Sequence, residues 1–402
     1  MIAICHALLV SLVPFAVVIS LIVTVHELGH FLTAKACDVA IERFSIGFGA
    51  ALAKWSDRSG VEWRIGWMPL GGYVKFAGDE NAASAPDRRG LAALKLEIEA
   101  REGPGASRRY LAFKPLWQRA LIVVAGPAAN LLLAILIFAG FFMAFGESAT
   151  PPVIRAVIPA EAGAQAGLLP GDRITALDGR AVSTFEDVQF YVQYRVGVPV
   201  NVTVDRSGRA LTLRVRPEGA REASLFGGSQ SVGRLGLVAA AAPPRAVSAP
   251  RALWLGVSRT YDVAATTLYY LGRILSGQVS PAQLHSVVGM VHASGALTHQ
   301  ADLASRDSGV NWVEAEVFLL SQLAAVMSIS IGLMNLLPVP TLDGGHLMFY
   351  AYEALARKPA NAAVQAAGYR AGLALLVGLM LFATWNDLAR LRLFQVFGSL
   401  FS

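Results

Sequence analysis

The chain has 402 residues, of which 54% are hydrophobic and only 15% are charged, and its formal net charge is +6. This composition is too apolar for an ordinary soluble protein and indicates a multi-span membrane protein with soluble parts. The Lys and Arg residues are spread along the chain rather than clustered. This distribution argues against nucleic acid as a partner and favours contact with the anionic headgroups of membrane lipid.

The first apolar segment, residues 3–34, predicts a transmembrane helix that ends at Lys35. Near its end it contains His26-Glu27-Leu28-Gly29-His30. Because residues four apart share one face of a helix, His26 and His30 can hold one metal ion together. Glu27 lies beside them and can take a proton from an attacking water. Ionisable side chains inside an apolar span are costly and usually functional, so the motif predicts a catalytic metal site rather than two histidines satisfied in a helix core.

Residues 36–115 form a loop with many Lys and Arg residues, which favours a cytoplasmic location. Within this loop, alternating apolar residues over 41–77 predict β-strands. Two interpretations are open: a small cytoplasmic sheet, or a membrane-reentrant β-hairpin that offers a strand edge to an extended substrate. In the second interpretation, the candidate substrate-binding residues of the loop are Gly71, Gly72, Tyr73 and Val74.

The second span, residues 116–146, contains Gly126-Pro127-Ala128-Ala129-Asn130. Small residues let helices approach closely, and Asn130 can hydrogen-bond across helices. By itself such a stretch is usually a packing feature. We also count Asn130 among the candidate substrate-binding residues.

Residues 150–240 predict a soluble β-rich domain. Asp178-Gly179 is a turn signal, and residues 185–194 predict a helix that precedes a hairpin around Ser207-Gly208. The stretch from Pro159 to Leu168, the G-D-x-I turn after it and the D-G pair resemble a PDZ domain of the permuted bacterial type. A generic β domain is the plainer alternative. A PDZ domain here would either screen substrates by size or bind a peptide end.

The rest of the chain alternates between polar and apolar segments. Residues 253–275 are apolar but are interrupted by Arg259, Asp262 and Arg273, so we interpret them as an amphipathic helix on the membrane surface rather than a span. The other predicted segments are a connector at 82–109 with a short helix around 91–101, periplasmic amphipathic helices at 241–320, a third span at 321–350, a cytoplasmic loop at 351–367, a fourth span at 368–386 and a C-terminal tail at 387–402.

A catalytic zinc usually takes three protein ligands and leaves one position for water. His26 and His30 supply two, and the stretch at residues 335–346 is the obvious source of the third. With four spans and both termini outside, the first and third spans run in the same direction. Asp343 then falls at the same depth as the two histidines, on the cytoplasmic side. His346 stays open as an alternative to Asp343.

Two prolines, Pro338 and Pro340, interrupt the helical pattern of the third span. Irregular backbone at membrane depth is tolerated only where it is buried in protein or lines a wet cavity. Asn335 precedes the prolines and can hydrogen-bond a substrate backbone or a developing oxyanion. The sequence therefore predicts that this broken segment lines the active site.

These motifs, H-E-L-G-H in the first span and N-L-L-P-V-P-T-L-D-G-G-H in the third, resemble the site-2 protease family of intramembrane zinc metalloproteases. P-L-G-G-Y-V-K-F and G-P-A-A-N are similar to its bacterial branch of the RseP (regulator of sigma-E protease) type, which cleaves anti-sigma factors. The resemblance covers nearly the whole chain, although this length holds one PDZ domain where the best-known member has two. It implies Zn²⁺ held by His26, His30 and Asp343. It also implies Glu27 as the catalytic residue, the hairpin near Tyr73 as a substrate clamp and a periplasmic PDZ domain.

We therefore expect an α-helical polytopic membrane protein of about four transmembrane helices, with a membrane-associated β-hairpin region and one inserted periplasmic PDZ domain. The expected location is a bacterial inner membrane. The expected activity is zinc-dependent cleavage of single-span, anti-sigma-factor-like membrane proteins that a site-1 protease has already trimmed. One alternative is a zinc-binding transporter, which should show paired broken helices in internal repeats. The other is a PDZ membrane scaffold, which would not need Glu27.

Overall fold

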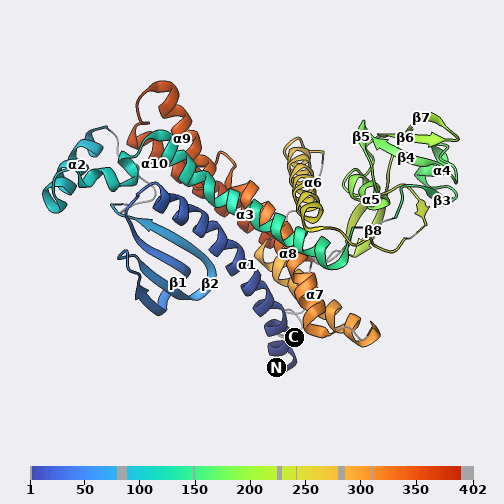
Figure 1. Cartoon of the computed structure of the whole chain (residues 1–402), viewed down its shortest axis with the longest axis horizontal. Helices are drawn as coiled ribbons and strands as arrows, with labels where there is room; N and C mark the ends of the chain where they lie inside the picture. Colours follow the sequence, from blue (N-terminus) through green and yellow to red (C-terminus); the bar gives the residue numbers. More distant parts are fainter. Residues whose placement is uncertain are drawn as a thin grey trace. The chain divides into compact units, whose positions relative to one another are not determined.

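The computed structural model divides the chain into two compact units, one of residues 1–137 and 285–388 and the other of residues 138–284 and 389–402. The structure describes residues 2–78, 88–147, 150–223, 229–240, 242–278, 286–308 and 311–390. Long helices make up most of the first unit, and the second contains eight of the ten described strands, β3 to β10 (Figure 1).

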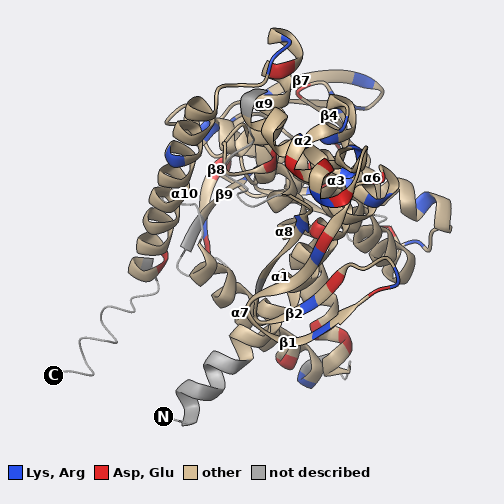
Figure 2. Cartoon of the chain, turned by 90° about the vertical axis from the view of Figure 1, so that its left-hand side faces the viewer, with Lys and Arg blue, Asp and Glu red and all other residues tan. Residues whose placement is uncertain are grey.

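Four of the described helices are long and apolar enough to cross a membrane. They are α1 (Ile2–Ala36), α3 (Leu116–Phe145), α8 (Trp312–Asn335) and α10 (Ala362–Arg390). About 20 helical residues cross the ~30 Å apolar layer of a bilayer. α10 carries few charged residues along most of its length (Figure 2) and exceeds the predicted span 368–386 at both ends. The prediction of four long apolar helices in a multi-pass membrane protein is confirmed.

The third apolar helix differs from its predicted bounds. α8 begins at Trp312, where the Asn311 side chain accepts a backbone N–H at 2.9 Å and caps the helix. Glu314 lies in its first turn, and such charge is why the hydropathy pattern placed the start later. A separate helix, α9 (Asp343–Ala356), follows after a turn. α8 therefore begins before the predicted broken span 321–350, and the predicted break at the prolines lies between α8 and α9.

The core of the first unit lies where α1, α8 and a further helix, α7 (Val287–Ser308), pack together. Its buried apolar side chains are Phe15, Val18, Ile22, Leu297, Leu323, Ala324 and Met327. Between helices that cross a membrane, close van der Waals packing of such side chains supplies the attraction. This packing holds α1, the helix that carries the H-E-L-G-H motif, against α8.

The predicted β-rich loop forms an antiparallel sheet of β1 (Ile41–Ser56) and β2 (Glu62–Phe76). Both strands are bent, so Phe44 of β1 pairs with Val74 on one side and with Trp63 on the other. The first part of β1 therefore lies in the middle, and the last residues of β2 form a strand edge. The Phe44 and Trp63 rings pack on Phe31 of α1, each with its centroid 5.3 Å from the Phe31 ring.

The connector between this sheet and α3 contains the short helix that the sequence predicts. It is α2 (Arg88–Glu102), and two short 3-10 turns, Ala106–Arg109 and Leu111–Phe113, follow it. Tyr110 lies between the turns and is buried, with its hydroxyl donating to Glu102 at 2.6 Å. This contact ties the end of α2 to the segment between the two turns.

The second unit contains a four-stranded antiparallel sheet in the order β5-β4-β6-β7 and two further strand pairs, β10-β3 and β8-β9. Its strands and short helices are β3 (Ile154–Val157), α4 (Ala162–Gln165), β4 (Arg173–Leu177), β5 (Arg180–Ala181), α5 (Phe185–Val192), β6 (Val200–Arg206), β7 (Arg209–Val215), β8 (Glu218–Ala223), β9 (Ser229–Arg234) and β10 (Leu237–Ala239). α5 agrees with the predicted helix over 185–194, and the pairing of β6 with β7 agrees with the predicted hairpin around Ser207-Gly208.

One further helix of the second unit is α6 (Ala249–Leu275), and it is not among the four described helices that could cross a membrane. This agrees with the prediction of an amphipathic helix over residues 253–275. The Arg259 guanidinium of α6 lies 4.2 Å from the ring centroid of Phe190 on α5, and Arg195 lies 4.4 Å from that of Tyr269 on α6. Cation–π contacts of this kind hold α6 to the β-rich part of the unit.

Candidate active site

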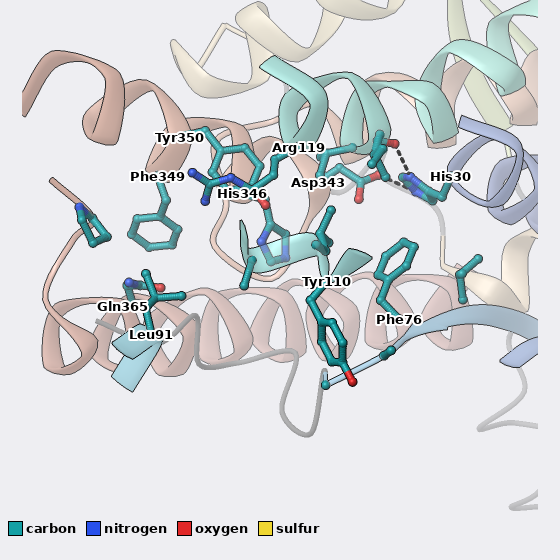
Figure 3. A pocket seen from close by; sticks show the side chains of 18 of the residues that line it. His30, Phe76, Leu91, Tyr110, Arg119, Asp343, His346, Phe349, Tyr350 and Gln365 are labelled. Carbon is teal, nitrogen blue, oxygen red and sulfur yellow. Dashed lines mark hydrogen bonds and ion pairs between the residues drawn. The ribbon is translucent and has the colours of Figure 1, made fainter. Parts of the chain in front are cut away.

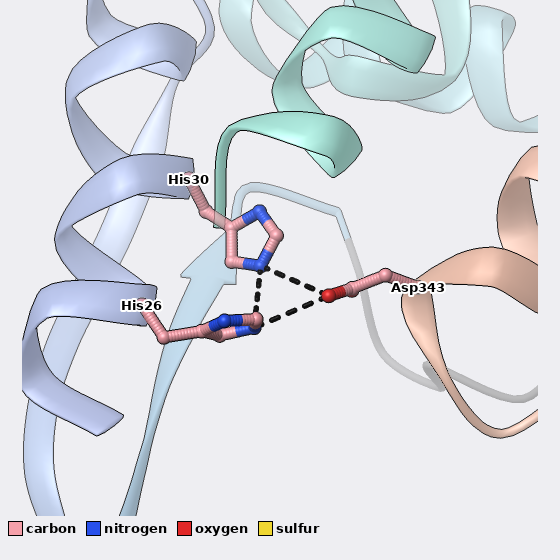
Figure 4. Close-up of side chains that lie close together, drawn as sticks. All are labelled: His26, His30 and Asp343. Atoms are coloured by element: carbon pink, nitrogen blue, oxygen red, sulfur yellow. Dashed lines mark hydrogen bonds and ion pairs between the residues drawn. The ribbon is translucent and has the colours of Figure 1, made fainter. Parts of the chain in front are cut away.

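Both histidines of the first motif lie on one face of α1, as their spacing predicts (Figure 4). Their rings meet edge to face with centroids 4.8 Å apart, and the two Nε2 atoms are 3.2 Å apart. His26 is buried and His30 is partly buried. Two ring nitrogens this close repel each other if both lone pairs point into the space between them. A cation in that space removes the repulsion. The pair therefore fits a shared metal ion.

The third member of the cluster is Asp343, the first residue of α9 (Figure 4). Its Oδ2 lies 3.2 Å from Nε2 of His26 and 3.6 Å from Nε2 of His30. All three atoms lie within 4.8 Å of one another, and Oδ2 is buried without a hydrogen bond from the described residues. Two imidazole nitrogens and one carboxylate oxygen suit a catalytic zinc that keeps a position open for water. The donor set therefore fits zinc.

The backbone between α8 and α9 is what brings Asp343 to the histidines. Pro338 and Pro340 lie in this turn, and backbone hydrogen bonds such as Leu342 N–H to Val339 C=O at 2.8 Å close it. Gly344 and Gly345 follow Asp343 and are buried against the turn, so close that a Cβ at either one would collide with its backbone. The D-G-G sequence is therefore required for α9 to begin this near the prolines.

The predicted alternative ligand, His346, is not part of this cluster of described residues. Its Nε2 lies 3.0 Å from the hydroxyl of Tyr369 on α10. It lies one helical turn beyond Asp343 and lines the same cavity (Figure 3). The structure therefore favours Asp343 over His346 beside the two imidazoles.

Side chains and backbone of α3 and α8 contact the imidazole nitrogens. Nδ1 of His30 lies 2.8 Å from the carbonyl oxygen of Ile122, and Nδ1 of His26 lies 3.3 Å from Nδ2 of Asn130. Asn335, the last residue of α8, places its Nδ2 3.3 Å from Nε2 of His26 and lines the cavity. Asn335 therefore lies at the open side of the cluster, where the sequence predicts it, whereas Asn130 lies behind His26 and does not line the cavity.

Glu27 lines the cavity between the histidines and the end of β2. The backbone N–H of Val74 hydrogen-bonds its carboxylate. Gly72 is packed closely here, because a Cβ at this position would lie 3.3 Å from Cγ of Glu27 and 2.8 Å from the Ser45 carbonyl oxygen. Tyr73 and Val74 line the cavity. Gly72, Tyr73 and Val74 are therefore next to the predicted base, whereas Gly71 packs against the ring of Phe48.

The cavity has a volume of about 620 Å³ and reaches from the histidines along α9 toward α2 (Figure 3). Its far part is lined by residues that the sequence does not single out, among them Arg119, Tyr110, Tyr350 and Glu353. Arg119 forms an ion pair with Glu353 at 2.6 Å and lies 4.9 Å from the ring centroid of Tyr350. Arg119 stands at the start of an apolar span, where a basic residue is ordinarily an interface anchor, so no motif marks it.

Two imidazoles, two carboxylates and an amide that meet beside helices able to cross a membrane define the site of a membrane metallopeptidase. The profile of Peptidase family M50 matches residues 14–379, and the chain belongs to this family, the site-2 proteases. "Metalloprotease MmpA" of Caulobacter vibrioides is 46% identical over 98% of this chain and 99% of its own length. "Putative zinc metalloprotease Atu1380" of Agrobacterium fabrum is 42% identical over 94% of this chain and 96% of its own length. The predictions of the family, of a metallopeptidase and of zinc as its cofactor are confirmed.

Proposed function

We propose that this protein cleaves the transmembrane segment of single-span membrane proteins within the plane of the membrane. The observation that carries this proposal is the position of His26, Glu27 and His30 inside a helix stretch, Val10–Ala36, that is long and apolar enough to cross a bilayer. Peptide bonds that reach such a site come from apolar segments.

In this proposal His26, His30 and Asp343 hold the zinc ion, and Glu27 is the catalytic residue. When bound, zinc polarises the scissile carbonyl and makes a water molecule a stronger acid. Glu27 accepts the proton of the attacking water and later donates it to the leaving amine. The amide N–H of Asn335 faces the same space and can donate to the oxyanion that develops on the carbonyl.

The end of β2 offers a place for the substrate backbone. Phe44 and Ile46 of β1 pair with Val74 and Gly72, and this leaves the other side of the β2 end facing the cavity. An intact helix hides its carbonyl groups, so a substrate must unwind before cleavage. A locally extended segment can then pair with the edge of β2 beside Glu27.

A bacterial inner membrane is supported by the relatives' organisms and by the four apolar helices. We assign the basic loop 36–115 to the cytoplasm by its positive charge, and residues 150–240, as a PDZ domain, to the periplasm. There the domain would admit substrates whose outer part, as in trimmed anti-sigma-factor-like proteins, has been removed by a site-1 protease.

Purified protein in detergent, incubated with a tagged single-span substrate, tests the activity. We expect fragments whose new termini, mapped by mass spectrometry, lie inside the apolar segment, and no fragments when a zinc chelator is present. Cleavage confined to the soluble parts of the substrate would contradict intramembrane proteolysis. The same assay with the substrate's outer domain left attached tests selection, since deletion of residues 153–218 should then permit cleavage.

A further inference from the structure

One face of α3 lies directly against the two imidazoles. Ile122, Gly126 and Asn130 are four residues apart and therefore share this face. The carbonyl oxygen of Ile122 contacts Nδ1 of His30, and the Asn130 amide contacts Nδ1 of His26. A Cβ at Gly126 would collide with both rings, so only glycine leaves them room. The G-P-A-A-N stretch therefore packs directly against the two imidazole rings.

The hydrogen-bonding needs of the rings define what this face must supply. Both Nε2 atoms point at each other and at Asp343, so both must present a lone pair if they are to hold a metal ion. A neutral imidazole with a lone pair on Nε2 carries its proton on Nδ1. For His30 the acceptor of that proton is the Ile122 carbonyl, which can only accept. His26 needs an acceptor as well.

Asn130 is the group that can provide it. Its side chain is fully buried, and its Oδ1 has no hydrogen-bond partner among the described residues. A half-turn of the amide plane exchanges Oδ1 and Nδ2, after which Oδ1 accepts the Nδ1–H of His26. This rotation gives Oδ1 of Asn130 and the Nδ1–H of His26 a hydrogen bond to each other. A buried donor or acceptor without a hydrogen bond costs free energy.

We propose that Asn130 is a positioning residue of the metal site, whose Oδ1 accepts the Nδ1–H of His26 and fixes that ring with its Nε2 lone pair toward the metal. Gly126 supplies the space in which both rings turn. This replaces the substrate-binding role that the sequence assigns to Asn130. The inference rests on the proposed ligation of zinc by His26 and His30.

A second contact of Asn130 provides a matched control. The Ser328 hydroxyl on α8 donates to the backbone carbonyl of Asn130 at 2.8 Å, and both residues are fully buried. Ser328→Ala therefore removes a buried hydrogen bond to the same residue without touching the imidazole. A purely structural role of this region would make both substitutions behave alike.

The test measures zinc affinity of the full-length apoprotein in detergent by competition with a chromophoric chelator, and the visible spectrum after loading with Co²⁺. Loss of a partner that orients a metal-binding histidine typically weakens metal affinity about 10- to 100-fold. We expect this loss for Asn130→Leu, which keeps the side-chain size, together with a changed Co²⁺ spectrum. Asn130→Asp keeps an acceptor and should bind within a few-fold of the unsubstituted protein, as should Ser328→Ala.

Two results would overturn the proposal: Asn130→Leu with unchanged zinc affinity and Co²⁺ spectrum, or Asn130→Leu and Asn130→Asp weakened equally. If Asn130→Leu does not yield a monodisperse protein, Asn130→Ala replaces it in the same comparison with Asn130→Asp. If the assignment of His26 as a zinc ligand is wrong, His26→Ala will bind zinc with unchanged affinity. This result is different from the two results that overturn the role of Asn130.

Discussion

The backbone N–H of Val74 hydrogen-bonds the carboxylate of Glu27, and this joins the edge strand of the β1–β2 sheet to the candidate base. The two residues come from different elements, since Glu27 is on α1 and Val74 is near the end of β2. A substrate that pairs with this edge would therefore lie beside this candidate base. The sheet thereby both positions Glu27 and offers the strand edge.

Val74→Pro removes the N–H that Glu27 accepts, because proline has no amide hydrogen. The hydrogen bond orients the carboxylate, and a misplacement near 1 Å can cost about 10²-fold in rate, so we expect a kcat lower by up to about 100-fold with unchanged zinc content. Val74→Ala keeps the N–H and serves as the control. Equal losses in both variants would mean that the Val74 side chain matters and that the hydrogen bond does not.

Gly126→Ala should abolish tight zinc binding. The added methyl group collides with both imidazole rings, and its nearest neighbours include ring atoms of His26 and His30. Gly140→Ala on the same helix is the matched control, since nothing lies within 4 Å of a Cβ at that position. Metal analysis of the two purified variants decides the matter. Full zinc occupancy in Gly126→Ala would show that the rings have more room than the structure gives them.

The sequence predicts the position of the site well because its chemistry is carried by local spacing. His26 and His30 need only a helix to meet on one face. The choice between Asp343 and His346 depends on where α8 ends and α9 begins, and two prolines alone do not define that turn. Asn130 is ambiguous for a related reason, because a polar residue in a span can face either a cavity or a neighbouring side chain.

Other parts of the fold could not be read from local patterns. Arg119 and Glu353 are far apart in sequence and pair only because α3 and α9 meet at the cavity. α8 begins earlier than its hydropathy predicts, because Glu314 and Glu316 lower the mean hydropathy of its first turns. Glu316 accepts a hydrogen bond from Thr298 of α7 at 3.1 Å, which explains how a carboxylate is accommodated there.

The second unit contains an ion pair whose contribution depends on pH. Arg206 donates to both carboxylate oxygens of Asp172, at 2.7 and 2.8 Å, and Asp172 is only 1% exposed. The Arg206 guanidinium holds the pKa of Asp172 below its usual range, although burial acts to raise that pKa. Because the folded pKa lies below the unfolded value of about 3.9, the pair stabilises the fold at neutral pH. This stabilisation is lost as the pH falls below about 4 and through the folded pKa.

Arg206→Gln should therefore destabilise this unit at pH 7, because it leaves the buried Asp172 carboxylate without its guanidinium partner. Hydrogen–deuterium exchange of peptides that cover β4 and β6 measures the effect locally in the full chain. After correction for intrinsic exchange, the difference from the unsubstituted protein should shrink as the pH is lowered toward 3. Arg209→Gln, at an exposed position of β7, is the control. A difference that stays constant over this pH range would rule out the ion pair as its cause.

Cleavage by Glu27→Gln tests the central claim most directly. The substitution keeps the size of the side chain but removes the base, and loss of general-base catalysis typically costs about 10²- to 10⁴-fold in rate. We expect the variant to insert normally, retain zinc, bind a single-span substrate and accumulate it uncut. Cleavage at the unsubstituted rate, under conditions in which a chelator still stops the reaction, would mean that another residue is the base and would contradict the account.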